Sequence, residues 1–395
     1  MSLKGVEAVM PDIVVVGAGA SGLTAAVCAA RLGARVTLLE KNDRIGKKLL
    51  ATGNGRCNLT NINITPDRYH GTDEDFPKAA LSGFGAEDAE SFFEGMGLFT
   101  RREAEGKVFP YCARASAVLD VFRMELEKLG VEIVCGFDVK EIFRRKTAFE
   151  IVSWDGQHLF SDRVIFAAGG KAAPNLGGGG SGYDILKKLG HKLTDLRPSI
   201  VQIKTDTDRI SGLKGVKCEA KVSGFGKSYT GELLFTDYGI SGPPAFSLSS
   251  YYRQNGEISI DFFPDIDEKS LYMRLREKAD NIINPDNLFT GILHKNIAVA
   301  IIKQAGQGIK EIAAVCKDFR LRAEGTLSWN NAQVTAGGIV TRDVNPETFE
   351  SLICPGLYIT GEILDVDGDC GGFNLQWAWS SGYFAGTDAA VKGAN

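Results

Sequence analysis

The most regular hydrophobic pattern lies near the start of the chain. Residues 12–16 (DIVVV) form a β-branched run, which predicts a buried parallel strand. Residues 23–33 (LTAAVCAARLG) have helical character and stop at Gly33, a plausible helix end. Residues 34–40 (ARVTLLE) predict a second strand that ends at Glu40. The pattern therefore predicts a strand–helix–strand unit.

The glycine turn inside this unit is typical of a dinucleotide site. The first glycine permits a tight turn, the second lets the backbone approach a pyrophosphate, and the third lets helix and strand pack closely. The free N–H groups of the helix start favour phosphates. Glu40 can accept both hydroxyls of an adenosine ribose and would repel a 2′-phosphate, so we expect FAD or NAD rather than NADP. The turn consists of Gly17, Ala18, Gly19, Ala20, Ser21 and Gly22.

A second glycine-rich stretch also matches GxGxxG, through Gly177, Gly179 and Gly182. No strand leads directly into it, and Pro174 argues against strand continuity. We interpret it as a flexible turn followed by a helix from Tyr183, and we expect no second nucleotide-binding fold.

Further along, the pattern changes twice. Residues 86–99 are amphipathic, 130–143 predict a strand and turn, and 161–170 predict a buried strand. After residue 196, short alternating stretches predict antiparallel strands in a barrel or sandwich, and 268–322 reads as helical. The stretch FTDYGISGP (235–243) reads as a hairpin turn, with a wall of the substrate site as the alternative. Near the end, a strand stops at Gly361-Glu362, and a glycine turn leads into an apolar helix that begins near Asn374.

Composition narrows the classes of function. The net charge is −4 and the pI about 5.8, so nothing indicates a strong grip on nucleic acid or on an anionic membrane. Glycine supplies 47 of 395 residues, about 12% against the usual ~7%, which indicates many tight turns. The eight cysteines contain no Cys-x-x-Cys pair and the four histidines are scattered. We therefore expect a cytoplasmic protein with no metal site, no secretory signal and no membrane-spanning helix.

Three stretches resemble one family of flavoproteins. They are GKKLLATGNGRCNLTN (46–61), NAQVTAGGIV (331–340) and GEILDVDGDCGGFNLQWAWSSG (361–382). Together they resemble the BaiN/YhiN/aminoacetone-oxidase-like FAD-binding family, one of the two-dinucleotide-binding-domain flavoproteins, and the resemblance spans nearly the whole chain. Many relatives have Ser where this chain has Thr52 and Tyr where it has Phe373. Neither change should remove a flavin contact that the backbone makes.

The resemblance implies an α/β fold with a Rossmann-like FAD-binding domain, an inserted β-rich, barrel-like domain and a small helical domain. The expected boundaries are 1–195 with 336–395 for FAD binding, 196–266 with 323–335 for the β-rich insert, and 267–322 for the helical insert. The expected cofactor is FAD, with NAD(P)H as a transient co-substrate. Ring-exposed chemistry should sit where the inserts cover the flavin.

The resemblance also assigns roles at matching positions. The turn from Gly17 to Gly22 should hold the pyrophosphate, and the second turn should aim a helix start at the flavin N1–C2=O edge, which stabilises the reduced flavin. The remaining expected contacts are Glu40 and Lys41 at the ribose; Val139 at the adenine; Lys47 and Lys48 at the phosphates or ribityl chain; Thr52, Gly53, Asn54, Cys57 and Asn58 at the ring; Ala168, Gly169 and Gly170 in a turn near the cofactor; Gly361 and Glu362 at the ribityl hydroxyls and phosphate; and Asn374, Leu375 and Gln376 at the pyrimidine end.

No catalytic residue can be named from the sequence. Cys57 is either a proton donor or thiol relay beside the flavin, or a small packing residue. Arg56 is either an anchor for an acidic substrate or half of a structural ion pair. Trp329, Trp377 and Trp379 are stacking candidates, and core packing is the alternative that we favour for the last two. Tyr111 and Tyr238 are proton-donor candidates without supporting spacing.

Three functions remain open at this point. The first is an FAD-dependent oxidoreductase that moves hydride between flavin and a small organic substrate, with NAD(P)H as donor or oxygen as acceptor. The second is a flavin-dependent reductase of ribosomal RNA that forms dihydrouridine, against which the acidic net charge counts. The third is a non-catalytic flavin-binding sensor or assembly protein. The sequence indicates no oligomeric state.

Overall fold

The predicted strand–helix–strand unit lies at the centre of a five-stranded parallel sheet. The strand order is β20-β11-β1-β2-β7. The chain order reverses beside β1, since β2 lies on one side of it and β11 on the other. Ligands of such sheets bind outside the carboxyl ends of the strands at this point. The strands are β1 (Asp12–Val16), β2 (Arg35–Glu40), β7 (Glu132–Cys135), β11 (Arg163–Phe166) and β20 (Leu357–Ile359).

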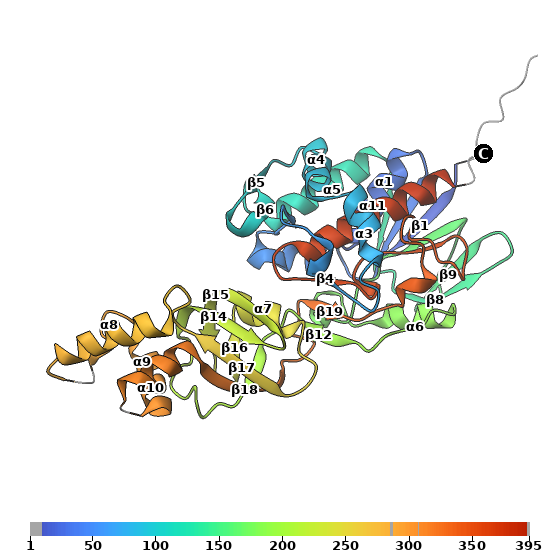
Figure 1. Cartoon of the computed structure of the whole chain (residues 1–395). Coiled ribbons are helices and arrows are strands. Elements are labelled where there is room, and N and C mark those ends of the chain that lie inside the picture. Colours follow the sequence, from blue (N-terminus) through green and yellow to red (C-terminus); the bar gives the residue numbers. More distant parts are fainter. Residues whose placement is uncertain (1–9, 285–286, 307, 393–395) are drawn as a thin grey trace, which may run out of the picture. The chain divides into compact units, whose positions relative to one another are not determined.

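The computed structural model describes residues 10–284, 287–306 and 308–392. Contacts divide the chain into two units. The first runs to Arg197 and resumes at Val334, and the second is Pro198–Gln333 (Figure 1). The parallel sheet belongs to the first unit.

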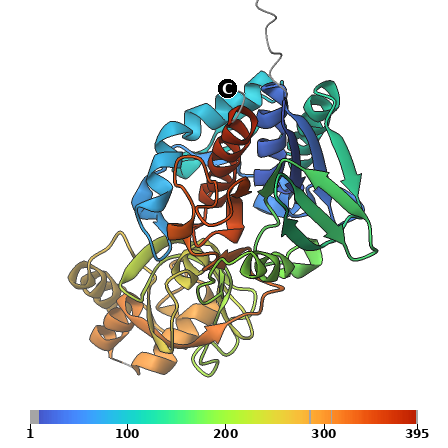
Figure 2. The ribbon, with the colours of Figure 1, turned by 90° about the vertical axis from the view of Figure 1, so that its right-hand side faces the viewer.

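Two parallel helices, α1 (Ala20–Arg31) and α11 (Phe373–Val391), pack side by side against the parallel sheet (Figure 2). They approach so closely that Cβ atoms added to Gly382 and Gly386 would lie 2.4 and 2.3 Å from the carbonyl oxygens of Ser21 and Ala25. Only glycine permits this separation. A small antiparallel sheet of β8 (Val139–Arg144), β9 (Phe149–Ser153) and β10 (His158–Ser161) completes the layers.

Shorter elements surround this framework. The amphipathic stretch predicted at 86–99 contains one of these helices. The helices are α2 (Lys47–Ala51), α3 (Phe76–Gly83), α4 (Ala86–Gly95), α5 (Ala115–Lys128) and α6 (Ser181–Lys188); the short strands are β3 (Thr60–Asn61), β4 (Tyr69–His70), β5 (Thr100–Arg102), β6 (Lys107–Pro110), β12 (Arg197–Ser199), β19 (Val334–Ala336) and β21 (Asp367–Gly368); the 3₁₀ turns are η1 (Thr52–Gly55), η2 (Pro66–Arg68), η3 (Ala104–Gly106), η4 (Pro174–Leu176), η6 (Thr341–Asp343) and η7 (Gly361–Ile363).

The second unit is built on a closed antiparallel barrel, which confirms the β-rich prediction. Closure leaves no unpaired sheet edge in the barrel. Residues 236–238 turn between two of its strands, so the hairpin interpretation of 235–243 is confirmed. The strands, in barrel order, are β13 (Ile203–Thr205), β16 (Gly239–Ser241), β15 (Lys227–Phe235), β14 (Lys217–Gly224), β17 (Gly256–Asp261) and β18 (Phe319–Thr326), and α7 (Pro243–Ser249) packs against β15.

The helices α8 (Glu268–Asp280), α9 (Lys295–Ala305) and α10 (Ile309–Lys317) share one hydrophobic core with the barrel. The prediction of helix through residue 322 is wrong at its end, because Phe319 begins strand β18. Phe319 and Leu321 are buried while Arg320 and Arg322 are exposed, which is the period of a strand. The division into three domains stays a prediction. None of the helices in the described ranges is long and apolar enough to cross a membrane.

Candidate functional site

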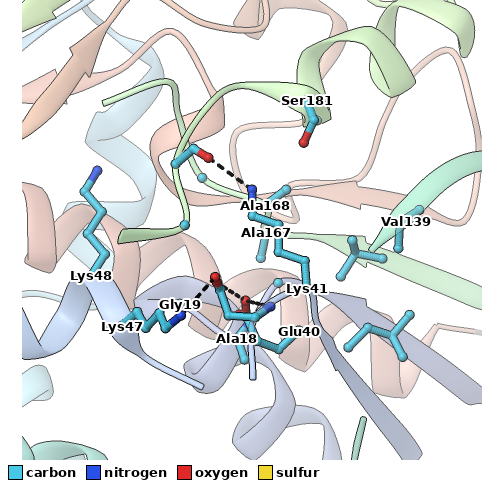
Figure 3. A pocket seen from close by; sticks show the side chains of 18 of the residues that line it. Ala18, Gly19, Glu40, Lys41, Lys47, Lys48, Val139, Ala167, Ala168 and Ser181 are labelled. Atoms are coloured by element: carbon cyan, nitrogen blue, oxygen red, sulfur yellow. Dashed lines mark hydrogen bonds between the residues drawn. The ribbon is translucent and has the colours of Figure 1, made fainter. Parts of the chain in front are cut away.

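A cavity opens at the carboxyl ends of the parallel strands, and the empty space in and before it, open solvent included, is about 790 Å³. Segments that follow β1, β2, β7, β11 and β20 all contribute to it, as expected for this topology. Figure 3 shows Lys47 and Lys48 on one side of the cavity and Val139 on the other. The predicted site residues that line it are Gly17, Ala18, Gly19, Glu40, Lys41, Lys47, Lys48, Val139, Ala168, Gly169, Gly170 and Glu362.

The three motif glycines meet different surroundings. A Cβ on Gly22 would lie 1.9 Å from the carbonyl oxygen of Gly17, and one on Gly17 would lie 2.5 Å from that of Ala167. Gly17 also has a φ of +103°, which disfavours other residues. A Cβ on Gly19, in contrast, would meet no described atom within 4 Å. Gly17 and Gly22 are thus required by packing, whereas Gly19 keeps space open beside the cavity.

The start of α1 can receive an anion. Its N-cap is Gly19, its first turn holds no acidic residue, and no side chain of the described chain caps it. The first N–H groups of a helix have no partner within the helix, and they carry partial positive charge. Ala20, Ser21 and Gly22 form this first turn without lining the cavity with their side chains, and Ser21 packs against Gly361.

Glu40 connects the end of β2 to the glycine turn. Its carboxylate accepts hydrogen bonds from the backbone N–H of Ala18 at 3.1 Å, and from the backbone and side chain of Asn42 at 2.9 and 2.5 Å. The side chain is buried and lines the cavity. Beside it, Lys41 Nζ donates to the carbonyl oxygen of Gly178 at 3.0 Å. The acid predicted to meet a ribose is thus fixed at the cavity wall.

Glu362 joins two segments at the cavity. Its Oε2 lies 2.5 Å from Lys48 Nζ, and its Oε1 accepts from the backbone N–H of Thr335 at 2.9 Å. Thr335 Oγ1 accepts from the backbone N–H groups of Lys171 and Ala172 at 2.8 and 2.9 Å. A Cβ on Gly170 would lie 2.4 Å from that Oγ1. Thr335 therefore orders the turn after β11, although sequence reasoning gave it no role.

Lys47 and Lys48 are the first two residues of α2. The N-cap of this helix is Gly46, which adopts the left-handed conformation. Lys47 forms an ion pair of 2.8 Å with Asp43 and lies on the same side of the cavity as Lys48 (Figure 3). Both lysines line the cavity and each already has a carboxylate partner, and an ammonium group has three N–H donors, so each can also donate to a phosphate there.

The second glycine-rich helix start has a different design. Gly372, in the left-handed conformation, is the N-cap of α11; no described side chain caps the helix, and its first turn contains no acid. Asn374 Oδ1 accepts from the N–H of Gly368 at 2.9 Å, and its Nδ2 donates to the carbonyl of Gly368 at 2.7 Å. Gln376 is fully buried and donates to the carbonyl oxygens of Phe84 and Gly85. These two side chains hold protein loops, so any ligand contact there would come from the backbone.

The two helix starts point the same way and are offset. Gly382 packs on Ser21 and Gly386 on Ala25, so the helices run parallel. Ser21 is the second residue of α1, whereas Gly382 is the tenth of α11. At 1.5 Å per residue, α11 begins about 12 Å beyond the start of α1. Two uncapped helix starts in this arrangement suit an elongated ligand with negative charge at two places.

The loop around Asn58 meets the start of α11. A Cβ on Gly372 would lie 3.2 Å from Asn58 Oδ1, and that buried oxygen has no hydrogen-bond partner in the described part of the chain. Gly53 and Asn54 adopt left-handed φ values of 56° and 54°, which turn the chain sharply before it. Thr52 Oγ1 donates to the carbonyl of Leu49 at 2.6 Å. An unpaired buried carboxamide oxygen here is a ready acceptor for a ligand N–H.

Cys57 is completely buried, and burial raises the pKa of its thiol to about 12. It is therefore a neutral thiol at physiological pH, which favours the packing interpretation over a thiol relay. Arg56 is ion-paired with Glu103 at 2.5 Å and lies 4.0 Å from the ring centroid of Phe109. This arrangement favours the structural interpretation of Arg56.

The aromatic candidates divide by burial. Trp377 and Trp379 are buried and donate their indole N–H groups to the carbonyl oxygens of Gly361 and Leu59, at 3.2 and 2.7 Å. Their expected role in core packing is confirmed. Tyr111 is 68% exposed. Tyr238 and Trp329 belong to the second unit, and neither is among the residues that line the cavity.

Sequence reasoning missed one wall of the cavity. Gly177, Gly178, Ser181 and Gly182 line it, from η4 and the start of α6. No strand leads into this segment, as predicted, and α6 begins at Ser181, two residues before the expected start. The GxGxxG match in this segment could have identified this wall. Its Gly177 and Gly182 line the same cavity as the first glycine turn and do not form a second nucleotide-binding fold. Asn42 and Asp138 also line the cavity and were not predicted.

These features fit FAD on structural grounds. The open space at Gly19, the two uncapped helix starts and the orphaned Asn58 oxygen can accept the phosphates and the ring edge of one extended dinucleotide. Comparison with known proteins agrees. The HI0933-like protein Rossmann domain model matches residues 11–388.

Curated relatives match over nearly their full lengths. The chain is 38% identical to a 3-dehydro-bile acid delta(4,6)-reductase of Clostridium scindens, over 97% of this chain and 100% of that protein. It is 30% identical to a ribosomal RNA dihydrouridine synthase of Escherichia coli, over 95% and 97%. A solved 3-ketosteroid delta1-dehydrogenase from Sterolibacterium denitrificans shares the fold, with a TM-score of 0.53, 13% identity, and 96% and 99% of the two chains covered. The chain therefore belongs to the HI0933-like Rossmann-domain family and is an FAD-dependent oxidoreductase.

Proposed function

We propose that the protein reduces a carbon–carbon double bond conjugated to a carbonyl group in a small, flat, largely apolar molecule of the steroid class. The observation that carries this proposal is the 38% identity to a bile acid reductase over 97% of this chain and 100% of that protein. The activities of the two kinds of relatives share this chemistry, because forming dihydrouridine also saturates a double bond conjugated to a carbonyl.

When bound, FAD supplies the two electrons and the hydride of the reduction. We assign its pyrophosphate to the start of α1, its adenosine to the wall that contains Glu40 and Val139, and its ribityl chain to Lys48 and Glu362. The backbone of α11 and Asn58 then face the pyrimidine edge of the ring. Positive partial charge from the helix start favours the reduced, anionic ring.

A second candidate is reduction of uracil in ribosomal RNA. It is favoured by the 30% and 31% identity to two dihydrouridine synthases, each over more than nine-tenths of this chain. The net charge of −4 provides no general attraction to RNA, which is why we rank it second. The free state of all eight cysteines supports action in the cytoplasm.

The test uses purified protein with FAD bound. We expect a flavin absorbance spectrum that bleaches anaerobically with NADH or NADPH, and that returns when a 3-keto-4-ene bile acid is added. The matched control is the same bile acid without its ring double bonds, which should leave the flavin reduced. Recovery of colour with ribosomal RNA but not with the enone would favour the second candidate, and recovery with neither would refute the proposal.

A further inference from the structure

A lysine side chain joins two walls of the cavity. Lys41 follows Glu40 at the end of β2, and its Nζ donates to the backbone carbonyl of Gly178 at 3.0 Å. Both partners line the cavity and both are half-buried, so the bond lies where the cavity meets solvent. Figure 3 shows the Lys41 side chain extended from the side that holds Glu40 toward the side that holds Ala168. We call this contact the Lys41 bridge.

The fold holds the first end of the Lys41 bridge in place. Glu40 is buried, and its carboxylate accepts hydrogen bonds from the backbone N–H of Ala18 at 3.1 Å and from that of Asn42 at 2.9 Å. These bonds fix the residues before and after Lys41. The point from which the lysine side chain extends is therefore set by contacts within the protein.

The second end is held by close packing. A Cβ added to Gly178 would lie 2.0 Å from the carbonyl oxygen of Ala172, and the Gly178 N–H donates to the carbonyl of Ala173 at 3.2 Å. A Cβ added to Gly177 would lie 2.7 Å from Asn42 Nδ2. The close approach that glycine permits thus holds the acceptor oxygen of the bridge within reach of Lys41.

Between these two ends, the methylene stem of Lys41 is the part that can move. A lysine side chain has many rotamers, and its release costs one hydrogen bond from a charged donor. Breaking the bond therefore opens the space between the two walls without any movement of the backbone. Forming it again closes that space with protein atoms alone.

We propose that the Lys41 bridge is a gate for the cofactor, which opens for FAD to enter or leave and closes over the adenosine once FAD is bound. This inference rests on the cofactor placement given with the proposed function, in which the adenosine lies at the wall that contains Glu40 and Val139. Because both partners of the bridge belong to the protein, the bond obstructs entry and release alike. Its effect is to keep FAD in place through many turnovers.

The test measures both rates in Lys41→Met, which keeps the length of the side chain and removes its N–H donors. Quenching of FAD fluorescence on rapid mixing with apoprotein gives the association rate. Transfer of FAD from the holoprotein to an excess of an unrelated FAD-binding apoprotein gives the release rate. We expect both rate constants to rise by about tenfold or more, the scale of one hydrogen bond to a charged group, with a Kd within about threefold of wild type. Lys41→Arg keeps a charged donor and should return both rates toward wild type.

Lys278→Met is the matched control, because Lys278 Nζ also donates to a backbone carbonyl, that of Thr290 at 2.6 Å, in the second unit. It should change neither rate, and the melting temperature reports whether each variant folds. Faster release with unchanged association in Lys41→Met would overturn the inference, because the lysine would then be only a contact of the bound cofactor. Unchanged rates would overturn it too. A wild-type holoprotein that reduces no enone would instead refute the proposed function and leave these rates as they are.

Discussion

The two glycine-rich helix starts both leave their first backbone N–H groups without a side-chain cap, but different contacts hold them in place. At α1, close backbone contacts require Gly17 and Gly22, and the Glu40 carboxylate holds the turn through the N–H of Ala18. At α11, side chains of Asn374 and Gln376 hold the preceding loops while the backbone of the helix start stays uncapped. The first start is held by contacts from the end of β2 and from the segment after β11. The second is held by the nearby turn at Gly368 and by the distant Phe84 and Gly85.

The largest expected effect comes from Gly22→Ala. Its new Cβ would lie 1.9 Å from the backbone oxygen of Gly17, so the helix or the turn must move. We expect a loss of unfolding free energy of about 3 kcal/mol or more and no measurable FAD binding. Denaturant unfolding and FAD fluorescence quenching measure the two quantities. Wild-type stability would show that the first helix start is not fixed by backbone packing.

A smaller loss is expected from Gln376→Leu at the second start. The change leaves the carbonyl of Gly85 and the hydroxyl of Thr60 without their buried partner. We expect about 2–3 kcal/mol less unfolding free energy. Gln157→Leu is the matched control, because Gln157 is exposed and its change should cost less than about 0.5 kcal/mol. Equal losses in the two variants would contradict the structural role given to Gln376.

Gly19→Ala should separate stability from binding. Its Cβ would point into open space, so we expect unfolding free energy to change by less than about 1 kcal/mol. The methyl group would occupy the approach to the pyrophosphate, and FAD affinity should fall by about tenfold or more. Isothermal titration of the apoprotein with FAD measures this. Unchanged affinity would show that the phosphates lie elsewhere.

Cys57→Ala should have the smallest effect on catalysis. The thiol is buried with its pKa raised to about 12, so almost no thiolate exists below pH 10. We expect an unchanged kcat, a stability loss of about 1 kcal/mol, and no labelling of Cys57 by iodoacetamide at pH 8 in the folded protein. The exposed Cys112 and Cys135 should be labelled first, as mass spectrometry of tryptic peptides can show. A tenfold drop in kcat would restore the thiol-relay hypothesis.

Local signals in the sequence predicted some strand and helix bounds correctly and others wrongly. Strands β1 and β2 lie within a residue of the prediction, because their β-branched runs and the glycine turn are local signals. The helix predicted through 322 failed at Phe319, where alternation of apolar and charged residues already had the period of a strand.

At the site, the local strand–turn–helix–strand motif was enough to predict three residues that line the cavity, Gly17, Gly19 and Glu40. The orientation of Gln376 could not be predicted, because Phe84, Gly85 and Thr60 approach it only in the folded chain. The same reason hid Thr335, whose partner Glu362 is distant in sequence.

The chain enters and leaves the second unit through two neighbouring strands. The chain leaves the first unit at β12 and comes back at β19, and these two strands pair with each other. An insertion whose two ends meet in this way can be exchanged, shortened or elaborated without altering the register of the parallel sheet.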